Sequence, residues 1–141
     1  MNAKKFLSHL LSSSSYRGQA VHIEKIGGGE AVYDDLQTPL PEPLVASLRS
    51  KEIERLYCHQ VQCIELLRQG KNVAVVTSTA SGKSLCYNLP VLETMLSNTQ
   101  ARALYIYPTK ALAQDQLRGL QRLVEGAPGL ELLSGTYDGD T

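Results

Sequence analysis

The sequence predicts an α/β fold with a parallel sheet, on two observations. Three short apolar runs, 73–77, 103–107 and 130–133, have the length and composition of buried strands. The stretches between them carry apolar residues at helical spacing, so strands and helices alternate along the chain. Such an alternation is connected by right-handed crossovers, which place the strands parallel in one sheet.

The N-terminal part, residues 1–50, is expected to form a short α/β extension. Residues 1–15 indicate a short helix that frays into a run of serines, and 21–26 alternates apolar and polar residues as a strand does. A glycine triplet then favours a hairpin turn, with 31–33 as the returning strand. A proline-rich connector, 39–43, leads to a short helix.

Residues 51–141 are predicted to form the larger domain. A helix over 61–67 is expected to end at Gly70, which suits a left-handed C-terminal position. The helix after the first apolar run has leucines spaced 4, 3 and 4 residues apart, and Pro90 inside it removes one backbone hydrogen bond. Thr109 is expected to cap a further helix with the same spacing.

The stretch Thr77–Ser84 has the features of a phosphate-binding loop between a strand and a helix. Small residues let backbone N–H groups surround an anion, and the helix N-terminus adds its unpaired N–H groups and the positive end of its dipole. Lys83 would place its charge on the β- and γ-phosphates, and Ser84 would offer a hydroxyl to Mg²⁺. Thr77 replaces the usual first glycine, so a Gly-Lys-Ser turn without function is the alternative.

A second loop, 107–116, is predicted at the same edge of the sheet, with Lys110 in the first turn of the helix that it begins. A cation at a helix N-terminus opposes the helix dipole by about 0.3–1 kcal/mol. A nucleic-acid phosphate bound at this helix N-terminus would explain a lysine at this position. The alternative is a solvated lysine that tolerates this cost, and the residues alone do not decide between the two.

Composition excludes several classes of protein. Lys plus Arg is 14 and Asp plus Glu is 14, so the chain has no charged tail that by itself indicates nucleic acid. The three cysteines lack metal-ligand spacing and predict reduced thiols in an intracellular, cytoplasmic protein. No apolar run approaches the roughly 20 residues that span a bilayer, so no membrane partner is expected.

Three motifs, in order along the chain, resemble those of superfamily 2 DEAD/DEAH-box DNA helicases. Leu56–Gln60 is similar to their Gln-containing element, Thr77–Ser84 to motif I and Pro108–Gln116 to motif Ia. Ala80–Pro90 together with Tyr137–Thr141 resembles, more narrowly, bacterial and fungal repair helicases with a C-terminal zinc-binding domain, relatives of the RecQ4-like helicases. The resemblance covers most of the chain beyond its first helix.

The resemblance implies an incomplete RecA-like P-loop domain that uses ATP and Mg²⁺ and contacts single-stranded DNA. It implies that the amide of Gln60 recognises adenine and that Ser84 ligates Mg²⁺. The implied ATP-binding residues are Gln60, Thr79, Ala80, Ser81, Gly82, Lys83 and Ser84. The implied nucleic-acid-binding residues are Pro108, Thr109, Lys110 and Gly139.

The family's Asp-Glu-x-His motif and its second RecA-like domain are absent from these 141 residues. We therefore expect ATP binding and single-strand contact in this chain, and hydrolysis with 3′–5′ unwinding in a longer protein. One alternative is a non-catalytic binding fragment of a disrupted helicase gene. Another is an unrelated P-loop kinase or transporter ATPase, which Gln60 and 108–116 disfavour. The adenine-stacking residue stays open, since 41–45 holds no aromatic and Tyr57 is a weak substitute.

Overall fold

The computed structural model describes residues 3–18 and 30–137 of the chain. The chain divides into two compact units, Met1–Glu30 and Ala31–Thr141, and each is considered by itself. The predicted strand 21–26 and the glycine turn after it lie outside the described residues. Among the helices of the described part, none has the length and apolar content needed to cross a membrane.

The first unit contains helix α1, Ala3–Ser12, which confirms the predicted N-terminal helix. The helix ends where the serine run begins. Ser12 Oγ donates to the carbonyl of His9 at 3.1 Å, and the hydroxyls of Ser13 and Ser15 lie 2.8 Å apart. Serine side chains compete with the backbone for hydrogen bonds, and for that reason they favour helix ends over helix interiors.

The second unit contains a sheet of two short antiparallel strands, β1 (Tyr33–Asp34) and β2 (Leu56–Tyr57). In its register, Tyr33 lies opposite Tyr57. The predicted returning strand 31–33 therefore supplies part of β1, and its described partner is β2. Because β2 continues directly into the next helix, this pairing fixes where that helix starts.

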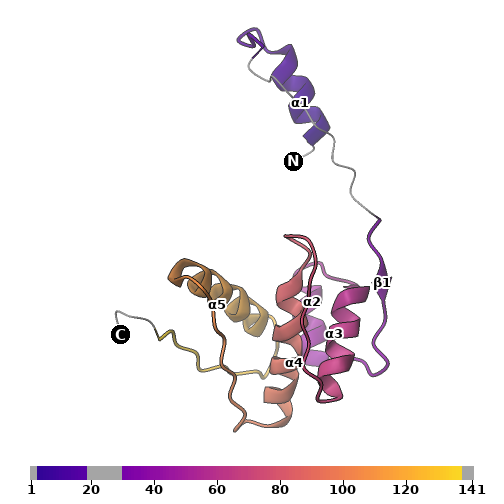
Figure 1. Ribbon diagram of the computed structural model, residues 1–141, viewed down its shortest axis with the longest axis vertical. Coiled ribbons are helices and arrows are strands. Elements are labelled where there is room, and N and C mark those ends of the chain that lie inside the picture. The colour runs from indigo at the N-terminus through magenta and orange to yellow at the C-terminus, as the bar shows by residue number, and fades with distance from the viewer. Residues whose placement is uncertain (1–2, 19–29, 138–141) are drawn as a thin grey trace. The chain divides into compact units, whose positions relative to one another are not determined.

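Four helices are described in the second unit: α2, Glu42–Arg49; α3, Cys58–Arg68; α4, Lys83–Ser97; and α5, Lys110–Glu125 (Figure 1). Each of them confirms a helix predicted from the spacing of apolar residues. Gly70, after α3, has the expected left-handed conformation with φ of 72°. Thr109 caps α5 as predicted, since its hydroxyl oxygen accepts a hydrogen bond from the backbone N–H of Leu112 at 3.2 Å.

Pro90 lies inside α4, which continues through it as one element. Because proline has no N–H, it leaves the carbonyl of Cys86 without its usual helical donor. Cys63 of α3 takes that place, with its thiol donating to the Cys86 carbonyl oxygen at 3.5 Å. Burial raises the pKa of the Cys63 thiol, which keeps this donor protonated at neutral pH. The Cys86 carbonyl, which Pro90 leaves without a helical donor, thus accepts a hydrogen bond that links α3 to α4.

The core of the second unit lies between its helices. Helix α3 packs on α4, while α2 contacts both α4 and α5. Fully buried side chains include Leu44 of α2, Ile64 of α3 and Leu92 of α4. Burying each of them stabilises the fold by roughly 1.5–3 kcal/mol. Helix α2, which belongs to the predicted extension 1–50, therefore shares a core with helices of 51–141.

The predicted parallel sheet is not formed in the part of the chain that the structure describes. The runs 73–77, 103–107 and 130–133 carry no strand. Several of their apolar side chains are exposed rather than buried, as Val76 at 93% and Leu104 at 87% show. A parallel strand is stable when neighbours pair with both of its edges and helices cover both of its faces. The described residues therefore do not confirm the predicted buried strands, because apolar content alone does not supply those partners.

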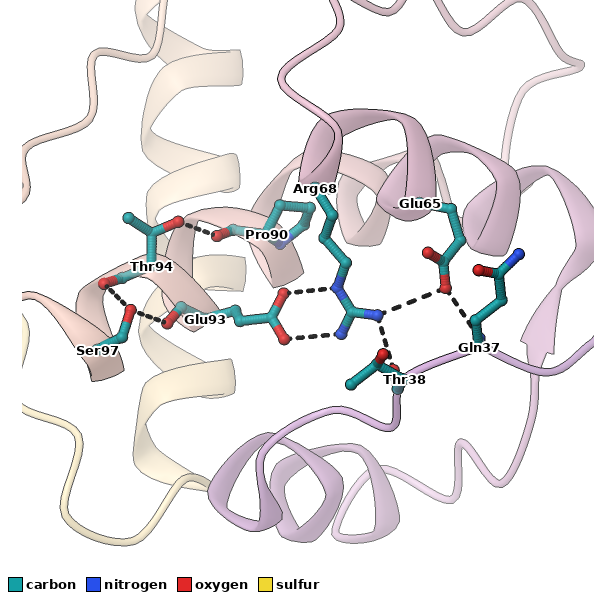
Figure 2. A network of polar contacts seen from close by, with 8 residues as sticks. All are labelled: Gln37, Thr38, Glu65, Arg68, Pro90, Glu93, Thr94 and Ser97. Atoms are coloured by element: carbon teal, nitrogen blue, oxygen red, sulfur yellow. Dashed lines mark hydrogen bonds and ion pairs between the residues drawn. The ribbon is translucent and has the colours of Figure 1, made fainter.

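Arg68, the last residue of α3, contacts both α4 and the connector before α2 (Figure 2). Its guanidinium makes a bidentate pair with Glu93, with Nη2–Oε1 and Nε–Oε2 distances of 2.7 and 3.0 Å. Nη1 donates to the carbonyl of Thr38 at 2.7 Å and to Glu65 at 3.5 Å. The hydrogen bonds to Glu93 raise the pKa of Arg68, and the two side chains are only 19% and 23% exposed. This geometry and this burial make the pair stronger than an ordinary surface ion pair.

We therefore predict that Arg68→Met lowers the free energy of unfolding by about 3 kcal/mol, because it leaves Glu93 partly buried without its partner. The matched control is Arg49→Met, whose pair with Glu42 is 69% and 76% exposed and is expected to contribute about 0–1 kcal/mol. Urea denaturation of both variants measures the difference. Equal losses would show that the Arg68 network contributes no more than a surface pair.

Candidate nucleotide-binding site

The predicted phosphate loop, Thr77–Ser84, is exposed over 77–80 and half-buried over 81–84, where it enters α4 at Lys83. Two of its residues have left-handed backbone conformations, Ala80 with φ of 58° and Gly82 with φ of 73°. Gly82 is also the residue that caps the N-terminus of α4. Left-handed residues among right-handed ones bring successive N–H groups to one side of a turn, and such turns bind anions. The loop therefore has a backbone suited to phosphate.

The ammonium group of Lys83 lies within this loop. Its Nζ donates to the carbonyl oxygens of Thr77, at 3.2 Å, and of Ser78. It also lies 3.3 Å from the hydroxyl of Ser81. The positive charge is therefore already among the loop's oxygen atoms. A bound phosphate would offer Lys83 charged oxygens in place of these neutral ones, which is a stronger type of hydrogen bond.

Two residues in the first turn of α3 contact two successive carbonyl groups of the loop. Gln60 is 2% exposed, and its Nε2 donates to the carbonyl of Gly82 at 2.8 Å. Its Oε1 accepts from the backbone N–H of Tyr57 at 2.8 Å, which closes the first turn of α3. His59 Nε2 lies 3.0 Å from the carbonyl oxygen of Ser81. We call Gln60 and His59 together the loop clamp.

Two separate features favour glycine at position 82. A Cβ atom there would lie 2.6 Å from Gln60 Nε2, closer than real side-chain contacts. Its φ of 73° is also strained for residues with a Cβ. The sequence predicted both Gln60 and Gly82 as nucleotide-binding residues, and the structure brings them into direct contact. The role of Gln60 towards adenine stays a prediction, because both of its amide atoms contact backbone groups.

A row of stacked side chains extends away from the loop clamp. Tyr57 stacks on His59 with ring centroids 5.7 Å apart, and on Tyr33 with centroids 5.1 Å apart. The guanidinium of Arg55 lies 5.3 Å from the centre of the Tyr33 ring. Sequence reasoning considered Tyr57 alone and missed His59 and Tyr33. His59 could have been found as the neighbour of Gln60, but Tyr33 reaches this row only through strand pairing.

The predicted nucleic-acid-binding segment, Pro108–Lys110, lies elsewhere in the second unit. Its three residues are exposed, and they line one part of a cavity of about 1260 Å³ between α4, α5 and the segments 99–110 and 129–137. No residue of the phosphate loop lines this cavity. The two groups of predicted residues therefore do not share this cavity, and Gly139 lies outside the described residues.

Comparison with known proteins identifies the family of the chain. A family model described as DEAD/DEAH box helicase matches residues 57–141, more than half of the chain. The uncharacterized ATP-dependent helicase YprA of Bacillus subtilis (strain 168) is 40% identical over 98% of this chain and 18% of its own length. The ATP-dependent helicase hrq1 of Schizosaccharomyces pombe is 40% identical over 98% of this chain and 13% of its own length. The chain therefore spans less than a fifth of these relatives.

Among solved structures, the DUF1998 helicase MrfA bound to DNA and AMPPNP matches with a TM-score of 0.78 and 37% identity. The match covers 100% of this chain and 19% of MrfA. These likenesses indicate a RecA-like fold, and they do not favour the alternatives of a non-catalytic binding fragment of a disrupted helicase gene or of an unrelated P-loop kinase or transporter ATPase. The family match begins at Tyr57, where the polypeptide enters the loop clamp, and continues through the phosphate loop and the second segment; the chain thus belongs to the DEAD/DEAH box helicase family.

Proposed function

We propose that this chain binds ATP at Thr77–Ser84 and single-stranded DNA at Pro108–Lys110, as part of an ATP-dependent DNA helicase. The observation that carries the proposal is the loop clamp, which holds a curled phosphate loop with a lysine among its oxygen atoms. The names of the relatives agree with it, since YprA and hrq1 are called ATP-dependent helicases and MrfA has been crystallised with DNA and AMPPNP. ATP hydrolysis and 3′–5′ unwinding are proposed for the longer protein.

In this proposal, different residues of the loop make different contacts to ATP. The backbone N–H groups of 79–82 and of the first turn of α4 surround the phosphates, and Lys83 neutralises their charge. The hydroxyl of Ser84, in the first turn of α4, would hold Mg²⁺, which would supply positive charge to the phosphates. Recognition of adenine by Gln60 would require its amide to exchange a present contact, to Gly82 or to Tyr57, for the base.

The runs 73–77, 103–107 and 130–133 are proposed as parallel strands of the RecA-like sheet in the longer protein. Their exposed apolar side chains, including Ile106 at 83% and Leu133 at 103%, are of the kind that a sheet buries. The cavity between α4 and α5 is lined by residues of two of these runs and by helix residues. It therefore lies where a sheet would pack against its covering helices.

Lys83→Ala is expected to abolish stabilisation of the chain by ATP with Mg²⁺ in a thermal melt. A ligand present at 100 times its Kd stabilises the folded state by about 2.7 kcal/mol, so the loss is easily measured. Lys71→Ala, which removes an exposed lysine that lies before the loop, is the control and should keep the full shift. An unchanged shift in Lys83→Ala would refute the assignment of the phosphate loop.

Gly82→Ala is expected to lose most of the ATP-dependent shift as well, because the new Cβ displaces Gln60 and opens the loop clamp. Gly70→Ala is the matched control. Its φ of 72° carries the same backbone strain, but nothing lies within 4 Å of a Cβ at that position. We expect both variants to lose about 1 kcal/mol of stability from strain, and only Gly82→Ala to lose the response to ATP. Similar ATP shifts in the two would show that the clamp is not needed for binding.

Lys110→Ala is expected to weaken binding of single-stranded DNA and to reduce the slope of log K against log salt concentration by about 0.7, the value for one phosphate contact on a single strand. Lys51→Ala, in the turn after α2, removes the same charge away from the segment and should leave the slope unchanged. Fluorescence anisotropy of a labelled oligonucleotide at several salt concentrations measures both. An identical slope in Lys110→Ala and the unaltered chain would rule out the contact.

A further inference from the structure

A cluster of three tyrosines and one glutamine lies between α4 and α5. The hydroxyl of Tyr87, on α4, donates to Gln116 Oε1, on α5, at 2.8 Å. The ring of Tyr105 meets Tyr87 edge-on with centroids 5.8 Å apart, and it stacks on Tyr107 at 6.3 Å. The cluster therefore joins α4, α5 and the segment that leads into α5.

The members of this cluster are close in sequence to both proposed binding segments. Tyr87 lies one helical turn after Lys83 on the same helix. Tyr107 immediately precedes the segment Pro108–Lys110, and Gln116 lies less than two turns into the helix that Lys110 begins. A helix is stiff over one or two turns, so a displacement of either binding segment moves its end of the cluster.

The environment of the cluster keeps its tyrosine hydroxyls protonated. Burial is the largest cause that raises the pKa of the Tyr87 and Tyr105 hydroxyls, in the case of Tyr105 to about 12. Both hydroxyls therefore stay protonated at neutral pH, and Tyr87 is the donor to Gln116. The Tyr105 hydroxyl is itself buried without a hydrogen-bond partner among the described residues. A broken Tyr87–Gln116 bond would thus leave further polar atoms unsatisfied in a partly apolar space.

Phosphate binding also changes the contacts at the start of α4. Its first residue, Lys83, is held by oxygen atoms of the loop, and those contacts compete with contacts to phosphate. Helix α5 packs mainly on α2 rather than on α4. The Tyr87–Gln116 bond is therefore a direct polar link between the helix that begins at the phosphate loop and a helix that packs on another neighbour.

We propose that the hydrogen bond between Tyr87 and Gln116 couples nucleotide binding at the phosphate loop to single-stranded DNA binding at Pro108–Lys110. The proposal rests on the proposed function and adds to it a positioning residue, Tyr87, that contacts neither ligand. Coupling of this kind is reciprocal, so DNA must raise the affinity for nucleotide by the same factor by which nucleotide raises the affinity for DNA.

The test measures the Kd of AMPPNP with Mg²⁺, with and without a saturating thymidine oligonucleotide, in this chain and in Tyr87→Phe. Phenylalanine keeps the ring and its packing and removes only the hydroxyl. In the unaltered chain we expect DNA to lower the Kd for nucleotide by about 5-fold or more, the lower end of ordinary coupling. In Tyr87→Phe we expect that ratio to fall to about 1, with the Kd in the absence of DNA changed less than about 2-fold.

Gln116→Leu removes the acceptor and should reproduce the effect of Tyr87→Phe, and the double variant should lose nothing more. Tyr137→Phe, at a tyrosine that is 92% exposed, is the matched control and should keep the coupling. If Tyr87→Phe does not fold, as its melt without ligand reveals, Gln116→Leu decides the question in its place.

The outcomes separate this inference from the proposed function. If the unaltered chain binds both ligands but shows no coupling, or if Tyr87→Phe and Gln116→Leu keep it, the inference is overturned and the proposed function stands. If the unaltered chain binds neither ligand, the proposed function fails and the inference fails with it. Loss of coupling in both variants, with each ligand still bound alone, supports the inference.

Discussion

The hydrogen bond from Gln60 to the carbonyl of Gly82 is the contact on which the candidate site depends. It joins the first turn of α3 to the residue that caps α4, and in doing so it fixes the turn of the phosphate loop. The same contact leaves no room for a side chain at Gly82. Because α4 starts at the next residue, the position of Lys83 follows from it. One buried amide therefore sets the loop, the start of the helix and the location of the positive charge.

The rest of the seam between α3 and α4 keeps that arrangement in place by different physical means. In the middle, the thiol of Cys63 donates to the carbonyl that Pro90 leaves free in α4. At the far end, a partly buried bidentate ion pair joins Arg68 to Glu93. Apolar burial alone would allow one helix to slide along the other, since it has no direction. Three directional contacts spread along the seam remove that freedom, and α4 can then carry Tyr87 to a defined place against α5.

Helices and strands differed in how far they could be predicted, and the difference is physical. The spacing of leucines predicted α4, and the N-cap of α5 at Thr109 was predicted from a single side chain, because both depend on residues within a few positions. The apolar runs around Val76, Leu104 and Leu133 predicted strands that the described structure does not form. A strand needs hydrogen-bond partners that are distant in sequence, and no local pattern guarantees them.

The sequence by itself determined the phosphate loop, the helix that follows it and the family resemblance, because each depends on residue types at short fixed spacings. It also indicated Gln60 and Gly82, but as separate members of motifs. Only the tertiary structure decided that these two residues touch, that Tyr33 joins the stacked row beside them, and that Tyr87 meets Gln116. Those contacts arise from the packing of α3 on α4 and from the pairing of β1 with β2. Packing and pairing join residues more than 20 positions apart, a range over which sequence spacing carries no geometric information.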